Sequence, residues 1–197
     1  MTIPNSRIPM SCSLVIRAYN ESQYLGRLLE GIRQQTIKDV EIILVDSGST
    51  DSTVSIAESF GAKVVHIPSA EFTFGRSLNF GIKAATREFI VIASAHVYPV
   101  YPDWLETLLR PFQDEQVALT YGKQRGYEGS KYSEHQIFHQ WYPDVSKPKQ
   151  ETAFCNNANA AIRKSLWQKN NYDETLTGLE DLAWAKWAKD QGHAIAY

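Results

Sequence analysis

Asp46 lies at a point in the sequence where a carboxylate is well placed to bind a ligand. Residues 40–45 before it are mostly apolar and largely β-branched, which is typical of a strand buried on both faces of a parallel sheet. Residues 47–53 after it are mostly Ser, Thr and Gly. A carboxylate at the carboxyl end of a buried strand lies where open α/β sheets bind ligands. The alternative is that Asp46 and Asp51 only cap a turn.

Arg76 and Asn79 form a second candidate pair. They are three residues apart near the start of a predicted helix, so both side chains can project from one face of it. An arginine beside the free N–H groups of a helix start suits an anionic group. The alternative is a surface arginine and an asparagine on the side of the helix.

Short apolar segments alternate with helical patterns through about residue 120. We predict strands at 13–16, 40–45, 63–67, 88–93 and 117–121, and helices from Asn20 or Ser22, from residues 51–53, at 77–86 and after Pro102. Such alternation with short connections is typical of a parallel sheet built from βα units.

Residues 122–150 are polar and aromatic without a clear period, and we expect either a loop over a site or a partly helical excursion. Residues 152–162 indicate a strand entering a turn, and residues 179–191 a helix closed by Gly192. The last five residues read as a strand after which the chain stops early.

Composition limits the classes of function. The chain has 197 residues, 43% of them hydrophobic and 21% charged, which suits one globular domain. The net charge of −2 gives no reason to expect nucleic-acid or membrane-surface binding. No apolar run is long enough to span a membrane. We interpret Cys12 and Cys155 as small buried hydrophobic residues and residues 1–12 as a loose leader. With only two cysteines, we expect a soluble protein of a reducing compartment.

Five segments in order resemble the family-2 glycosyltransferases with the GT-A fold: SLVIRAYNE, EIILVDSGSTDST, GRSLNFGIKAA, REFIVIASAHVYPVYPDWLETLL and GLEDLAWAKWA. The resemblance runs from about residue 13 to residue 197. It implies an α/β fold with a Rossmann-like, mostly parallel sheet flanked by helices. The chain would form a single domain that is truncated at its C-terminus. Residues 13–121 would be the nucleotide-sugar-binding part and residues 122–197 the acceptor-side part.

The same resemblance assigns site residues. It implies that Asp181, with Glu180 beside it, is the general base that takes the proton of the acceptor hydroxyl. The alternative is that both acids only favour the first turn of their helix through its dipole. The donor-binding residues it implies are Ala18, Tyr19, Glu21, Asp46, Ser47, Arg76, Asn79, Ala95 and His96. The acceptor-binding residues it implies are Asn156, Asn157 and Trp184, although turn formation and core packing are the alternatives for them.

His96 marks a departure from the family pattern. The family carries an Asp-x-Asp motif that holds a divalent cation, Mn²⁺ or Mg²⁺, where this chain has Ser94-Ala95-His96. Imidazole can ligate manganese, although hard cations prefer oxygen. A protonated His96 could instead neutralise the diphosphate directly. The remaining alternatives are that catalysis is lost and that His96 is only a satisfied side chain near a strand end.

By resemblance, the chain moves a sugar from a nucleotide-diphosphate sugar, a UDP- or dTDP-sugar, to a hydroxyl group with inversion. The acceptor would be a glycan, a lipid-linked molecule or a small molecule, in surface polysaccharide biosynthesis. AWAKWAK is not the Gln/Arg-x-x-Arg-Trp box of processive members, so we expect single additions. We expect a cytoplasmic protein, or one peripheral at the inner face of the membrane, and the sequence leaves the oligomeric state open.

Other classes are less favoured. A nicotinamide Rossmann enzyme needs Gly-x-Gly-x-x-Gly after the first strand, and RAYNES has no glycine. A nucleotidyltransferase needs a Gly-rich basic loop there. The main alternative is a catalytically reduced or incomplete sugar-nucleotide-binding relative that acts as a partner domain.

Overall fold

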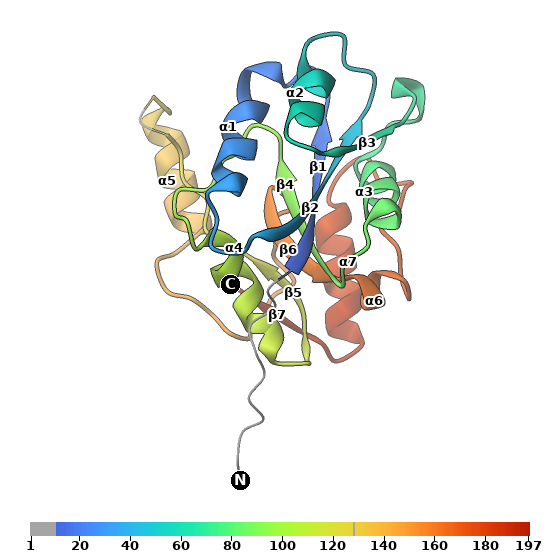
Figure 1. Ribbon diagram of the computed structural model, residues 1–197. Helices are drawn as coiled ribbons and strands as arrows, with labels where there is room; N and C mark the ends of the chain where they lie inside the picture. The colour runs from blue at the N-terminus through green and yellow to red at the C-terminus, as the bar shows by residue number, and fades with distance from the viewer. Residues whose placement is uncertain (1–10, 128) are drawn as a thin grey trace.

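The fold is built around a seven-stranded sheet with the strand order β3-β2-β1-β4-β6-β5-β7 (Figure 1). A computed structural model describes residues 11–127 and 129–197. The strands are β1 (Ser11–Ala18), β2 (Asp39–Asp46), β3 (Lys63–His66), β4 (Phe89–Ser94), β5 (Val117–Tyr121), β6 (Asn159–Arg163) and β7 (Ala194–Ala196). Together with its flanking helices the sheet forms one α/β domain, as the sequence predicts.

The sheet is mostly parallel, with one reversed strand. β1 pairs in parallel with both β2 and β4, and β3 with β2. β6 runs antiparallel to β4 and β5, while β7 is parallel to β5. The predicted strand within residues 152–162 is therefore β6, which begins later, at Asn159, and runs opposite to its neighbours.

The helices follow the predicted order. They are α1 (Ser22–Arg33), α2 (Thr53–Ser59), α3 (Phe74–Ala84), α4 (Trp104–Leu109), α5 (Tyr132–Trp141), α6 (Lys164–Trp167) and α7 (Glu180–Asp190), with 3₁₀ turns η1 (Ser69–Glu71) and η2 (Arg110–Gln113). α3 begins three residues before the predicted start, because the Thr73 side chain accepts a hydrogen bond from the Arg76 amide and caps it there. The stretch 122–150 contains α5, so the partly helical alternative holds.

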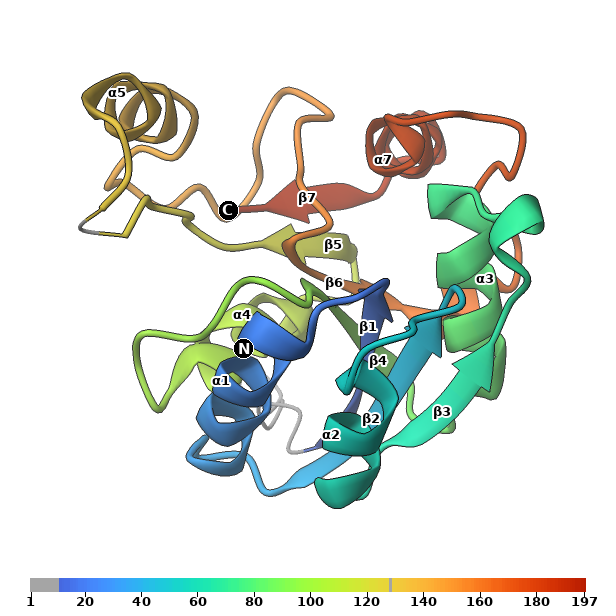
Figure 2. The ribbon, with the colours of Figure 1, turned by 90° about the horizontal axis from the view of Figure 1, so that it is seen from above.

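Two hydrophobic clusters cover the two faces of the sheet. α1, α2 and α4 pack on one face, and α3, α6 and α7 on the other (Figure 2). β1 contributes to both, since Leu14 and Ile16 lie in one cluster and Val15 in the other. Successive residues of a strand point to opposite faces, so a doubly covered strand reads as a continuous apolar run.

The first strand starts before its predicted position. Ser11 and Cys12 already belong to β1, so they are not part of a leader; residues 1–10 of that predicted leader lie outside the described residues. Cys12 and Cys155 are both buried and free. Burial raises the pKa of the Cys12 thiol to about 12, in keeping with a packing role. In the part of the chain that the structure describes, no helix has the length and hydropathy needed to cross a membrane.

Candidate active site

A pocket of about 340 Å³ opens at the carboxyl ends of β1, β2 and β4. β1 lies between β2 and β4 and runs parallel to both, so the carboxyl ends of the three strands meet at one edge of the sheet. The loop around η1 supplies the remaining wall. The lining residues are Arg17, Ala18, Tyr19, Glu21, Ser47, Ser69, Phe72, Phe74, Ser94, Ala95 and His96.

Six of the predicted donor-binding residues line this pocket. They are Ala18, Tyr19, Glu21, Ser47, Ala95 and His96. They come from three segments of the sequence, and strand pairing brings those segments together. Tyr19 is 56% exposed, so its ring is open to a ligand at the pocket rim.

Asp46 is not among the residues that line this pocket, and its contact with the donor stays a prediction. Its carboxylate is buried and accepts hydrogen bonds from the amides of Gly48 and Ser49, both at 3.1 Å. His66 Nδ1 lies 3.3 Å from Asp46 Oδ2. Burial acts to raise the pKa of Asp46, but the hydrogen bonds from Ser49, Gly48 and His66 outweigh it and hold that pKa below its usual value. Asp46 therefore fixes the turn that carries Ser47.

The loops after β1 and β2 are fastened to each other. The Asn20 amide donates to Ser49 Oγ, and the Thr50 amide donates to Asn20 Oδ1. Asn20 has a φ of 55°, a left-handed conformation that asparagine tolerates better than most residues. The Asp51 carboxylate accepts from the amides of Thr53 and Ser22, so it ties the starts of α2 and α1 together. The capping interpretation therefore describes Asp51.

Arg76 and Asn79, two further predicted donor-binding residues, bond to other parts of the protein. Arg76 pairs with Glu174 at 2.8 Å and with Glu71 at 3.5 Å. Asn79 is buried, and its Oδ1 accepts hydrogen bonds from the Trp167 indole and the Tyr172 amide. Both side chains hold the segment 167–174 against α3, and neither lines the pocket.

The acid pair begins α7 beside the pocket. Glu180 Oε1 lies 3.3 Å from Arg17 Nη1 and 3.4 Å from Asn157 Nδ2, and Glu180 is buried. Asp181 Oδ2 accepts from the Asn157 amide at 3.2 Å, and Oδ1 from the Leu182 amide at 2.8 Å. Burial raises the pKa of Asp181, and the Glu180 carboxylate raises it further, against the amide hydrogen bonds. A carboxylate with a raised pKa is suited to accept a proton.

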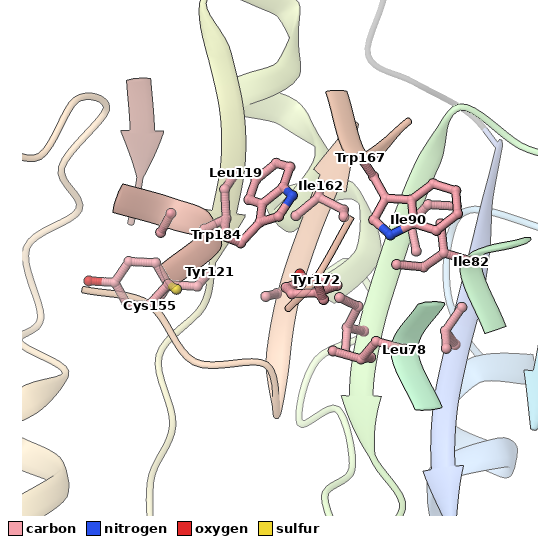
Figure 3. Packing of buried hydrophobic residues seen from close by; sticks show 14 of the residues in the cluster. Leu78, Ile82, Ile90, Leu119, Tyr121, Cys155, Ile162, Trp167, Tyr172 and Trp184 are labelled. Carbon is pink, nitrogen blue, oxygen red and sulfur yellow. The ribbon is translucent and has the colours of Figure 1, made fainter. Parts of the chain in front are cut away.

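The three predicted acceptor residues have different surroundings. Asn157 is buried and holds both acids, through its amide and its side chain. Asn156 Oδ1 accepts from the Ala158 amide, as a turn former does. Trp184 is only 2% exposed and packs in the core near Leu119 and Ile162 (Figure 3). This burial favours the core-packing alternative for Trp184.

Arg17, Phe72 and Phe74 line the pocket but were not among the predicted site residues. The Arg17 guanidinium lies 4.9 Å from the centre of the Phe74 ring, and the Phe72 and Phe74 rings meet edge to face at 5.3 Å. Two signals in the sequence point to them. Arg17 is a charge directly after the apolar run 14–16, and two phenylalanines interrupt the polar loop 69–76.

Comparison with known proteins identifies the family. The model of "Glycosyl transferase family 2" matches residues 13–170. The chain belongs to glycosyltransferase family 2. Among curated relatives, the O-antigen chain rhamnosyltransferase RfbN of Salmonella typhimurium is 26% identical over 95% of this chain and 64% of its own length. The poly(ribitol-phosphate) beta-glucosyltransferase of Bacillus spizizenii is 29% identical over 82% of this chain and 26% of its own length.

Solved structures confirm the fold of this family-2 chain. TarS of S. aureus superposes with a TM-score of 0.76 at 20% identity, covering 94% of this chain and 34% of that one. The mannosyltransferase PcManGT of Pyrobaculum calidifontis was solved in complex with GDP-Man and Mn²⁺. It superposes with a TM-score of 0.74 at 18% identity, covering 93% of this chain and 53% of that one. The chain thus spans less than two thirds of the length of each of these proteins.

The residues of this family-2 chain do not fit a divalent-cation site. His96 Nδ1 lies 3.3 Å from Glu21 Oε1, and the His96 side chain is 59% exposed. Within residues 11–127 and 129–197, no three His, Cys, Asp or Glu side chains are grouped so that they could hold a metal ion. Hard cations prefer several oxygen ligands, and the triplet Ser94-Ala95-His96 supplies no carboxylate.

Proposed function

We propose that this chain transfers a single sugar from a UDP- or dTDP-sugar to an acceptor hydroxyl with inversion of the anomeric configuration. The observation that carries this proposal is the contact between the strand-end pocket and the acid pair. Arg17 lines the pocket and also bonds Glu180, whose neighbour is Asp181. A donor in the pocket would therefore be adjacent to a carboxylate with a raised pKa.

In the proposed reaction, the acceptor oxygen attacks the anomeric carbon while the bond from that carbon to the diphosphate oxygen breaks. The electron pair of that bond leaves with the nucleoside diphosphate. Asp181 takes the proton of the attacking hydroxyl, and one in-line displacement inverts the configuration. Asn157 keeps Asp181 in position, since its backbone amide bonds Asp181 Oδ2. General-base assistance of this kind is worth roughly 10²–10⁴ in rate.

The classes of donor and acceptor are supported by likeness to known proteins. TarS has been solved with UDP and with UDP-GlcNAc, and PcManGT with GDP-Man. The curated relatives are named for O-antigen chains and poly(ribitol-phosphate). We infer an acceptor that is a glycan, a lipid-linked saccharide or a small molecule of surface polysaccharide assembly. We place this step in the cytoplasm or at the inner face of the membrane, and we infer that each encounter adds one sugar.

The test is release of nucleoside diphosphate from UDP-, dTDP- and GDP-sugars in the presence of rhamnose-terminated oligosaccharides or ribitol-phosphate oligomers. Asp181→Asn should lower kcat by roughly 10²–10⁴ and leave donor binding within about twofold. Asp190→Asn is the matched control, because Asp190 ends the same helix and is exposed in a pair with Lys186. The anomeric proton coupling of the product, measured by NMR, reports inversion.

A second candidate function is a sugar-nucleotide-binding relative without transfer activity, favoured by the missing carboxylates at Ser94-Ala95-His96. Donor binding in calorimetry without transfer to any acceptor would support it. Equal turnover by wild type and Asp181→Asn would contradict the assignment of Asp181 as the base.

A further inference from the structure

Arg17 occupies a fixed position between the donor pocket and the acid pair. Its backbone lies within the sheet, opposite Val45 of β2 and Ser94 of β4. Its side chain is only 15% exposed, yet it lines the pocket. The sheet therefore holds this guanidinium at the pocket wall from two sides.

The guanidinium of Arg17 has hydrogen-bonding capacity that the described residues do not use. Nη1 donates to Glu180 Oε1 at 3.3 Å and to the Phe74 carbonyl at 3.4 Å. Among the described residues, the hydrogen bonds of this guanidinium all come from Nη1. A guanidinium carries five N–H donors in a planar fork. The Nε and Nη2 edge is the edge that pairs with two oxygens of a carboxylate or phosphate.

A nucleoside diphosphate needs positive charge in this pocket, and few groups supply it. Arg17 is the sole Lys or Arg among the described residues that line the pocket. Arg76 is held by Glu174 and Glu71 outside it. His96 faces Glu21, and this pair does not fit a metal site. Arg17 is therefore the candidate for the positive charge that a diphosphate needs.

We propose that Arg17 binds the diphosphate of the donor directly, in place of a divalent cation, and that Glu180 positions it. This inference rests on the proposed function, since it assigns a role within the same site. The Glu180 carboxylate pairs with the buried guanidinium. When the donor binds, the free edge of Arg17 pairs with two phosphate oxygens. As the bond to the anomeric carbon breaks, negative charge grows on the diphosphate, and Arg17 stabilises it.

The experiment compares diphosphates with nucleosides. UDP, dTDP and GDP, and then uridine, thymidine and guanosine, are titrated by calorimetry into wild type, Arg17→Met, Arg17→Lys and Arg110→Met. Each titration is run in EDTA and in Mn²⁺. Arg110→Met is the matched control, because Arg110 is exposed and pairs with Glu106 away from the pocket.

We expect wild type to bind one nucleoside diphosphate in EDTA and to bind its nucleoside more weakly. Arg17→Met should weaken diphosphate binding about 10- to 100-fold, as loss of a charge-assisted pair implies, and leave nucleoside binding unchanged. The diphosphate affinity of Arg17→Lys should lie between those of wild type and Arg17→Met, because lysine keeps the positive charge but not the planar fork of N–H donors. The diphosphate affinity of Arg110→Met should equal that of wild type.

A purely structural role of Arg17 is tested separately. Arg17→Met leaves the Glu180 carboxylate buried without its cation, which alone lowers stability. The double variant Arg17→Met/Glu180→Gln removes both charges. We expect it to recover much of the melting temperature lost in Arg17→Met, while diphosphate binding stays weak. Recovery of diphosphate binding together with stability would overturn the proposal.

Two further outcomes separate an error in the role of Arg17 from an error in the proposed function. If Arg17→Met binds the diphosphate as wild type does, or if wild type binds it only with Mn²⁺, the role of Arg17 is wrong while the transferase proposal stands. If wild type binds no nucleoside diphosphate in EDTA or in Mn²⁺, the proposed function fails, and this inference fails with it.

Discussion

Asp181 shows how burial of one carboxylate connects catalysis to stability. Its raised pKa means that the folded protein keeps a proton over a pH range in which the unfolded chain has already lost it. The contribution of this group to stability is therefore complete below the unfolded pKa of about 3.9 and is lost as the pH rises through the folded value. An ionised Asp181 at neutral pH lowers stability, but it is the form that acts as a base.

This reasoning predicts the pH dependence of Asp181→Asn. Asparagine does not ionise, so the difference in unfolding free energy between Asp181→Asn and wild type should shift in favour of the variant as the pH rises from 3.5 to 7. Urea denaturation at several pH values measures it. Asp190→Asn, with its exposed side chain, is the control. A difference that stays flat with pH for Asp181→Asn would contradict the raised pKa.

Several polar residues that look functional in the sequence have structural partners in the folded protein. Asp46 bonds turn amides, and Asn79 bonds the Trp167 indole and the Tyr172 backbone. A buried polar group costs free energy unless it is paired, so the sequence must supply such residues to hold irregular segments. At the residue scale, the type of side chain alone did not separate binding from support.

The α3 helix illustrates how an element depends on close packing. Gly81 faces the sheet, and a Cβ added there would lie 2.4 Å from Val15 Cγ1 and 2.9 Å from Val45 Cγ2. The glycine therefore lets the helix approach β1 and β2. Because the loop that precedes α3 carries Phe72 and the helix begins at Phe74, this approach also places the aromatic wall of the pocket.

Gly81→Ala should lower the free energy of unfolding by about 1–3 kcal/mol through overpacking. Gly26→Ala is the matched control in α1, where the nearest atom to the added Cβ is Ile56 Cγ2 at 4.0 Å. That control should be stabilising by about 0.5–1 kcal/mol, because alanine favours a helix interior over glycine. Chemical denaturation measures both. Equal effects at the two positions would contradict the close approach of α3.

At the scale of the whole molecule, one sheet joins two hydrophobic clusters and one site. β1 supplies residues to both clusters, so neither face can lose its packing without disturbing the other. The contact between Arg17 and Glu180 joins residues 163 positions apart in the sequence. The site therefore depends on contacts between segments that are far apart in the chain.

We expect the chain to unfold in a single cooperative transition. Far-ultraviolet circular dichroism reports all helices, while tryptophan fluorescence reports Trp104 on one face and Trp167 and Trp184 on the other. The midpoints from the two methods in urea should coincide, as they do for single domains of two-state type. Fluorescence that changes at a clearly lower urea concentration than the dichroism would show that the two faces unfold separately.

The sequence alone determined the order of elements, the α/β class and the carboxyl edge of the sheet as the place of the site. Apolar runs and helical periodicity are local patterns, and their alternation is typical of βα units. Only the tertiary structure decided which groups Asp46, Arg76 and Asn79 bond, that Trp184 is buried, that β6 runs opposite to its neighbours, and that Arg17 reaches Glu180. The physical reason is that burial and hydrogen-bond partners depend on residues far away in the chain, which no local pattern contains.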